Sequence, residues 1–240
     1  MRFIEGFRFA HRESLAFVAA CPLLTLIPVA AEMVQHAAEM QGGLYDSMAR
    51  FRTMEDDALP VGLAFVKVFA LNLSTYWVIR FLAGGRDARA ARTLDPRAIR
   101  LFAVVLGLQM LLAALGLFVF TADTPVGTGF FVFSLIFAPL ASRFVAGAPL
   151  GIWIAPVTSI RTMLPHFMFA VGFSMLAILP LMGVHYALGI GAAFIAGSLG
   201  KWALLIADAL IVGWLTPVLA AVVYVVAIRP GPLDRRPHAA

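Results

Sequence analysis

Long apolar runs separated by short polar segments make up most of the chain. Six of these runs approach or exceed the roughly 17 to 25 residues that a helix needs to cross the hydrocarbon layer of a bilayer, and each adjoins an arginine or an acidic outer segment. The runs occupy 14–31, 59–79, 101–121, 126–142, 162–182 and 208–228. The pattern predicts an all-α integral membrane protein with six transmembrane helices arranged as three hairpins.

Two of the predicted hairpins contain a longer outer segment. In residues 32–57 six acidic side chains outnumber two arginines, and apolar side chains recur at three- and four-residue intervals, with an interruption at Gly42 and Gly43. This predicts one or two amphipathic helices on the outer surface of the first hairpin. In the third hairpin, the apolar and glycine-containing stretch 185–201 predicts a short outer or partly inserted helix.

The remaining segments are expected at the inner surface. Residues 1–13 mix aromatic and charged side chains, which is typical of a helix in the headgroup layer. Residues 146–157 are apolar but contain helix breakers, which indicates an interfacial or re-entrant segment. Residues 229–240 are rich in proline and arginine and predict a flexible cytoplasmic tail. One membrane domain over 1–240, with its six-helix bundle at 14–228, is the expected organisation.

The basic residues orient this bundle. Fourteen of the 18 lysines and arginines fall on one side of the six-crossing arrangement, and the stretch 76–100 alone contains six arginines. Clustered guanidinium groups stay on the cytoplasmic side because their passage through hydrocarbon is costly. We therefore expect a multi-pass protein of the bacterial inner membrane with both termini in the cytoplasm.

Composition supports this class. The chain is 62% hydrophobic and 13% charged, against about 45–50% and about a quarter in soluble domains. Its formal charge of +5 would be compatible with nucleic acid in a soluble protein, but here the basic residues flank apolar runs, which favours anionic lipid headgroups as partners and no nucleic acid. A single cysteine, Cys21, excludes an intramolecular disulfide.

Polar side chains inside predicted crossings are candidates for a transport path. Lys67 lies 13 residues from Arg80, about 20 Å along a helix, so it faces either the bundle interior or, through its long stem, the outer headgroups. Asp208 falls at or near the outer boundary of the last crossing. Asn72 and Gln109 suit either a polar path or hydrogen bonds between helices.

Motifs for catalysis or metal binding are not evident. The sequence contains no phosphate-binding glycine loop, no CxxC and no recognised metal-ligand spacing. Ser174 and His185 are too distant for a protease pair, since eleven residues span about 16 Å of helix. The sequence thus predicts no catalytic residue, no cofactor and no metal site, and it favours a non-enzymatic protein.

The basic loop forms the second candidate site. Its arginines recur every three to five residues, and a short helix through 88–93 would bring several of them to one side. They are Arg86, Arg89, Arg92, Arg97 and Arg100. This arrangement predicts contact with anionic lipid headgroups or an acidic protein partner; the alternative is that these arginines only fix the orientation of the chain during insertion.

One stretch carries a family resemblance. Arg143, then Pro149, then Ser159 just before the fifth crossing resemble the middle of YciC-like bacterial inner-membrane proteins and of the membrane domain of some glycerophosphodiester phosphodiesterases. The similarity covers about residues 140–175, and the acidic residue often found between that proline and serine is missing here. The resemblance implies a six-helix membrane protein that acts in the cell envelope.

Three functions remain open from the sequence. The first is a non-enzymatic membrane component: a lipid-handling or envelope-maintenance protein, or a subunit that binds a larger complex or a second copy of itself. The second is a small transporter or permease with a site near Lys67 and Asp208. The third, a lipid-modifying enzyme, lacks a visible acid, base or metal cluster.

Overall fold

The computed structural model describes residues 2–53, 58–121 and 124–233, which form α-helices joined by short turns and contain no strand. The helices are α1 (Phe3–Ala20), α2 (Pro22–Gln41), α3 (Met48–Thr53), α4 (Ala58–Ala83), α5 (Ala88–Arg92), α6 (Pro96–Ala114), α7 (Pro125–Leu140), α8 (Ser142–Gly147), α9 (Pro156–Met163), α10 (Phe167–Ala192) and α11 (Ser198–Ala227). The prediction of an all-α protein is confirmed for these residues.

Several helices are long and apolar enough to cross a membrane. Four stretches meet this requirement alone: Val61–Ala83, Pro96–Val119, Pro156–Ala192 and Ser198–Ala227. Two bent helix pairs meet it together, α1 with α2 and α7 with the segment that follows it. The described residues therefore contain four to six candidate spans, as expected for a membrane protein, while the count of six and the three-hairpin arrangement stay predictions.

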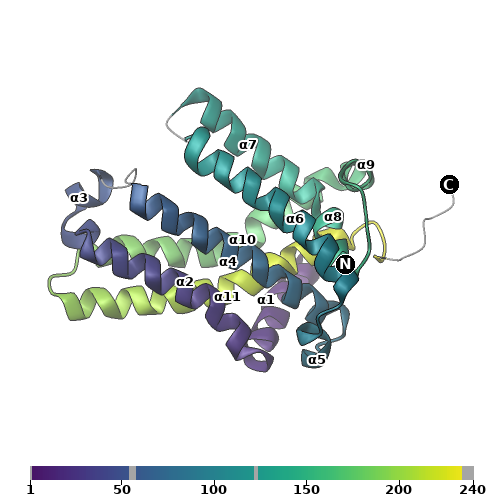
Figure 1. Ribbon diagram of the computed structural model, residues 1–240, viewed down its shortest axis with the longest axis horizontal. Helices are drawn as coiled ribbons and strands as arrows, with labels where there is room; N and C mark the ends of the chain where they lie inside the picture. The colour runs from purple at the N-terminus through teal and green to yellow at the C-terminus, as the bar shows by residue number, and fades with distance from the viewer. Residues whose placement is uncertain (1, 54–57, 122–123, 234–240) are drawn as a thin grey trace.

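Helix α11 lies at the centre of the bundle. It packs against α1, α2, α4, α8 and α10 (Figure 1), and fifteen of its residues are buried. Small side chains allow the close approach of these helices. At Gly213 the backbone of α11 comes so near α2 that an added Cβ would lie 2.5 Å from Cγ2 of Val29.

The first predicted crossing, 14–31, is not one straight helix. Helices α1 and α2 meet at 100°, and the break falls at Cys21, whose φ and ψ of −133° and 55° are not helical. Pro22 begins α2 and has no N–H to continue the hydrogen-bond ladder of α1. The sequence predicted one crossing over 14–31 in which Pro22 and Pro28 tend to kink the helix; in the structure Pro22 ends one helix and begins another.

The outer segments also differ from prediction. A break at Gly42–Gly43 is present, but α2 continues to Gln41, and its acidic face is buried inside the bundle rather than exposed on the outer surface. No separate helix occupies 185–201, because α10 runs on to Ala192 and α11 already begins at Ser198. The last crossing therefore starts ten residues before Asp208, not near it.

The middle hairpin lies along one side of the bundle. Helices α6 and α7 form one edge of the molecule in Figure 1; α6 packs against α4, and α7 packs against α10. Thr124 caps the start of α7 by accepting a hydrogen bond from Gly127 N. Many apolar side chains of this hairpin, such as Val104, Leu111 and Phe131, are exposed, as expected for surfaces that face lipid.

The segment 146–157 lies at the end of the bundle where α11 terminates. Its first residues are buried, and Arg143, just before it, donates hydrogen bonds to the carbonyl oxygens of Ala227 and Gly231. Ser159 donates to Leu140 O, and Pro149 O accepts from Arg80. The residues of the family resemblance thus join α7, α8, α9 and the end of α11. Residues 229–233 of the predicted flexible tail are held by this arginine, and 234–240 lie outside the described residues.

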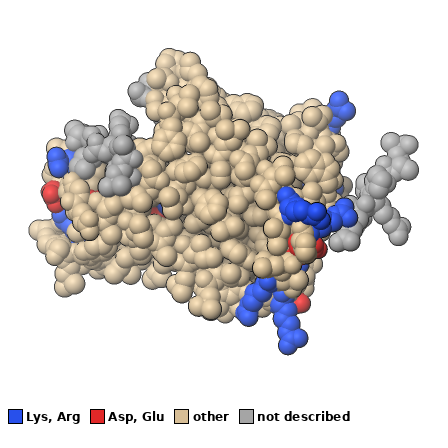
Figure 2. Space-filling view, in the orientation of Figure 1, with Lys and Arg blue, Asp and Glu red and all other residues tan. Residues whose placement is uncertain are grey.

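Charged residues lie mainly at the ends of the molecule. In the face shown in Figure 2, Lys and Arg gather near α5 and, in smaller number, near α3, while the middle is free of charged atoms. The start of α1 and the end of α11 lie together, since an added Cβ at Gly6 would lie 3.2 Å from Val225 Cγ1. The first and the last helix thus meet at one end of the bundle.

Candidate ion-binding site

Three ionisable residues of α2 face the interior of the bundle. Glu32, His36 and Glu39 follow one another at spacings of four and three residues, which places them on one side of a helix. Their exposed fractions are 0%, 3% and 6%. Each of them is paired, since His36 Nδ1 lies 3.0 Å from Glu39 Oε2 and His36 Nε2 lies 3.4 Å from Glu32 Oε1.

Helices α10 and α11 complete the site. Asp208 is fully buried on α11, and its Oδ2 lies 3.0 Å from His36 Nε2. Its other oxygen, Oδ1, lies 2.7 Å from Nδ1 of His185 on α10. The sequence left the burial of Asp208 open, and the structure has this carboxylate fully covered by neighbouring helices, ten residues after the start of α11 at Ser198.

Lys67 enters the same site from α4. Its Nζ lies 3.2 Å from Glu32 Oε2 and 3.3 Å from Oε1, and its side chain is 18% exposed. Of the two orientations that the sequence left open, the structure has the one toward the bundle interior. The ammonium group thus neutralises one of the buried carboxylates.

Tyr45 covers this group at the end next to Glu39. The chain turns at Gly43, which has a φ of 77°, and this turn brings the Tyr45 hydroxyl to 2.6 Å from Glu39 Oε2, to which it donates. Burial raises the pKa of Tyr45, so the phenol remains protonated and acts as a donor. Gln35 donates to the other oxygen of Glu39 at 2.7 Å.

We call this set the charge cluster; it comprises Glu32, His36, Glu39, Lys67, His185 and Asp208. With neutral histidines, three carboxylates against one ammonium leave a formal charge of −2. Buried charges cost several kcal/mol each unless they are paired or bind an ion. The cluster can therefore attract cations, either protons on the histidines and carboxylates or a metal ion between them.

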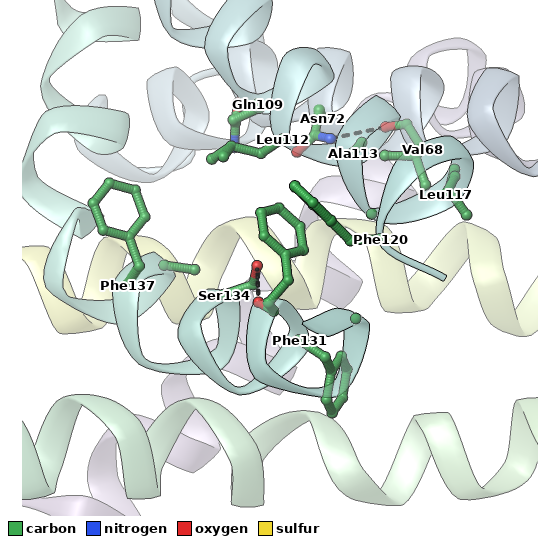
Figure 3. A pocket seen from close by; sticks show the side chains of 14 residues that line it. Val68, Asn72, Gln109, Leu112, Ala113, Leu117, Phe120, Phe131, Ser134 and Phe137 are labelled. Carbon is green, nitrogen blue, oxygen red and sulfur yellow. Dashed lines mark hydrogen bonds between the residues drawn. The ribbon is translucent and has the colours of Figure 1, made fainter. Parts of the chain in front are cut away.

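Asn72 and Gln109 do not join the charge cluster. They line a separate cavity of about 410 Å³ between α4, α6 and α7 (Figure 3). Asn72 Nδ2 donates to Val68 O at 3.0 Å, and the buried Oε1 of Gln109 has no hydrogen-bond partner among the described residues. Figure 3 shows both side chains on one wall, facing Ser134 and Phe137 on the other. The predicted four-residue path is thus divided between two sites, because α4 contacts different helices on its two sides.

The basic loop has an additional structural use. The predicted short helix is present as α5, but Arg86 precedes it and forms two hydrogen bonds with Glu13 of α1, at 2.6 and 2.7 Å. This contact raises the pKa of Arg86. Arg92 donates to Ala20 O, also in α1, while the side chain of Arg89 is exposed. Arg97 and Arg100 are exposed at the start of α6.

The sequence analysis missed Glu32, His36, Glu39 and His185 as site residues. Their acidic neighbours favoured an outer surface helix, although the spacing Glu32-x3-His36-x2-Glu39 next to an apolar run was a usable signal. That spacing also argues against the prediction of no metal site, because two possible ligands four residues apart on a helix lie on the same face. His185 offered no local signal because its partner, Asp208, is 23 residues away in another helix.

The site has to be interpreted from its own geometry, since no family model, no curated protein and no solved structure matches the chain.

Proposed function

We propose that the protein is a small membrane transporter for a cation and that the charge cluster is its binding site. The observation that carries this proposal is the burial of three carboxylates and one imidazole between apolar helices, in contact with a partly buried second imidazole and a partly buried ammonium group. Ionisable groups are rare in membrane-spanning helices and typically mark ion pathways or proton relays.

A purely structural role accounts less well for the cluster. Buried ion pairs contribute little net stability, and well-packed apolar side chains of similar volume are often as stabilising or more so. The neighbouring contacts of α11 are already apolar, for example at Val212 and Leu205. A cluster of this size is therefore better explained by the binding of a cation than by a contribution to stability.

The surrounding helices provide points where the structure can bend. Pro28 lies one turn before Glu32 in α2 and removes the hydrogen bond that Leu24 O would otherwise accept. Pro217 lies within α11, and α1 meets α2 at a sharp break. Interrupted helices next to a binding site are a common feature of transporters, where they allow alternating access.

The matching membrane placement is the bacterial inner membrane, with both termini in the cytoplasm and the basic loop at that face. The charge cluster then lies toward the outer side, because Lys67 is about 20 Å of helix rise from Arg80. A cation would reach it from the outer end of α2 and α11, next to Tyr45.

Ion flux into liposomes that contain the purified protein tests this proposal. Asp208→Asn removes one buried charge at constant size, and we expect it to abolish flux. Asp46→Asn is the matched control: Asp46 is exposed at the outer end and contacts Lys201 at 3.6 Å, outside the charge cluster, so flux should continue. Both variants should elute as the native species during gel filtration.

Flux of protons, monovalent and divalent cations is measured separately. If none of these moves faster than in empty liposomes, or if Asp208→Asn transports as well as Asp46→Asn, the transporter proposal is rejected. Lys67→Met provides a second variant: it leaves Glu32 without its cation and should change the rate, while Lys201→Met should not.

A second candidate function, lipid handling, rests on the apolar cavity between the hairpins. Its volume of about 410 Å³ is within the range of small-ligand sites, and phenylalanine rings such as Phe130 and Phe137 line it. An acyl chain would contact these rings, and Asn72 and Gln109 offer polar groups to an ester or amide. This function is the hypothesis of a lipid-handling or envelope-maintenance protein that the sequence also favoured.

A filled cavity tests lipid handling. Ala113 lines the cavity, so Ala113→Phe should reduce the amount of lipid that copurifies with the protein. Gly107→Phe on the same helix is the control, because nothing lies within 4 Å of a Cβ at that exposed position. Equal copurifying lipid in the two variants, measured by mass spectrometry, would count against this candidate.

A further inference from the structure

We infer that Glu32, His36 and Asp208 bind one divalent transition-metal cation, of which Zn²⁺ is the representative. This assignment names the cation of the proposed transporter, and only the statement that this cation is transported rests on the proposed function. Metal binding itself is measurable without transport. The remaining residues of the charge cluster orient the three ligands.

The ligand atoms already lie at suitable distances. One donor atom from each of the three residues lies within 4.8 Å of the others. His36 Nε2 is 3.0 Å from Asp208 Oδ2 and 3.4 Å from Glu32 Oε1. In a tetrahedral zinc site with bonds of about 2.0–2.1 Å, neighbouring ligand atoms are about 3.3 Å apart. The three groups therefore need little movement to coordinate one ion.

Each ligand is also held from behind by a second residue. Glu39 Oε2 lies 3.0 Å from Nδ1 of His36, which leaves Nε2 to face the other two ligands. His185 Nδ1 is 2.7 Å from Asp208 Oδ1, so the second oxygen of Asp208 is occupied. Lys67 Nζ lies 3.2 Å from Glu32 Oε2 and 3.3 Å from Oε1, and it donates its hydrogen bond to Oε1. The buried Oε2 of Glu32 therefore has no hydrogen-bond partner among the described residues and is available to an ion. Metal-binding histidines characteristically donate their other N–H to a carboxylate.

The donor set favours a transition metal. One imidazole nitrogen and two carboxylate oxygens suit Zn²⁺, whereas Ca²⁺ takes six to eight oxygens and Mg²⁺ requires an octahedral set with several waters. The charge agrees as well: a histidine that binds a metal is neutral, and with both histidines neutral a divalent ion offsets the formal charge of −2 that the three carboxylates and Lys67 leave. Three protein ligands leave one coordination position for water, as in zinc sites that exchange their ligand.

Titration of the purified full-length protein with Co²⁺ alone tests the assignment. The protein carries a purification tag without histidine and the substitution Cys21→Ala, which removes the single thiol of the chain. We expect saturation at one Co²⁺ per chain, with the intense visible absorption of tetrahedral cobalt, and displacement of that absorption by one equivalent of Zn²⁺.

Variants locate the ion. Asp208→Asn should abolish the cobalt absorption, and Glu39→Gln should weaken Co²⁺ binding about 10- to 100-fold, as for other residues that orient a metal ligand. His11→Gln is the control: His11 is a histidine of α1 that contacts Ala177 O and lies outside the charge cluster. It should bind Co²⁺ as the parent protein does.

The assignment is overturned if the parent protein shows no saturable Co²⁺ binding or if Glu39→Gln and His11→Gln bind equally well. Should Asp208→Asn fail to fold, His36→Cys decides: a bound Co²⁺ must then give a near-ultraviolet sulfur-to-metal absorption, and its absence in folded protein also overturns the site. Co²⁺ binding without flux removes the transporter proposal and leaves the metal site, whereas proton flux without Co²⁺ binding does the reverse.

Discussion

Replacing Gly213 by alanine is expected to separate the two helices that carry most of the charge cluster. The added Cβ would lie 2.5 Å from Cγ2 of Val29, far inside the usual contact distance of about 3.5–4.0 Å between carbon atoms. Val29 is β-branched and has essentially one rotamer in a helix, so it cannot turn away at low cost. The strain is therefore relieved by movement of α2 away from α11.

The size of this movement sets the magnitude of the effect. Restoring normal contact requires a shift of about 1 Å, which would lengthen the 3.0 Å contact between His36 Nε2 and Asp208 Oδ2 beyond hydrogen-bond range. Overpacking of this kind costs about 1–3 kcal/mol of folding free energy. For a chain of this length that corresponds to a fall in melting temperature of about 2–12 °C.

Thermal unfolding in detergent measures the effect, and two further variants test its cause. Gly183→Ala is the matched control: nothing lies within 4 Å of a Cβ at this exposed position of α10, so alanine should be neutral or stabilise by about 0.5–1 kcal/mol. In the double variant Gly213→Ala with Val29→Ala the clashing methyl group is gone, and part of the lost stability should return.

The reasoning is refuted if Gly213→Ala unfolds at the same temperature as Gly183→Ala, or if Val29→Ala lowers stability by the same amount with and without the alanine at position 213. Either result would mean that α2 and α11 are not in contact at this position. The metal site would then lose the packing that positions its ligands.

Three other predictions concern the surface and the membrane placement. With Cys21 removed, a cysteine at Ser47 should react with an impermeant reagent added outside intact cells and one at Arg97 should not; the opposite pattern would reverse the topology. Joint replacement of Arg89 and Arg97 by Gln should weaken binding to anionic vesicles in a salt-dependent manner, and unchanged binding would leave the loop as an orientation signal only. Arg86→Gln should lower the melting temperature because it leaves the buried Glu13 without its main partner, whereas an unchanged melting temperature would show that this contact does not hold α1 in place.

The apolar runs and the arginines at their ends were sufficient to predict the class of the protein. A run of about 20 apolar residues stabilises a membrane helix whatever its neighbours are, so the long helices α4, α6 and α11 could be located from local sequence. The break at Gly42–Gly43 and the short helix α5 were also found, because glycine and helix propensity act within a few residues.

The positions at which an apolar run bends were harder to predict from the sequence. Pro22 was recognised as a helix-disturbing residue, yet proline inside a helix and proline at the first position of a new helix share one local signature. The 100° turn at Cys21 is decided by α1 packing against α10 and α11, for example through Phe3 and Phe173. Similarly, a glycine-rich stretch after His185 suggested an interruption where packing against α11 keeps α10 helical to Ala192.

By itself, the sequence determined that these helices are apolar, roughly where the apolar runs lie and where basic residues collect at their ends. Only the tertiary structure decided that Glu32, His36 and Asp208 meet. His36 and Asp208 are 172 positions apart, and their contact depends on how α2 crosses α11 at Gly213. A buried ionic site requires groups from several helices because no single helix can pair all its own charges, and for this reason its composition appears only when the helices are packed.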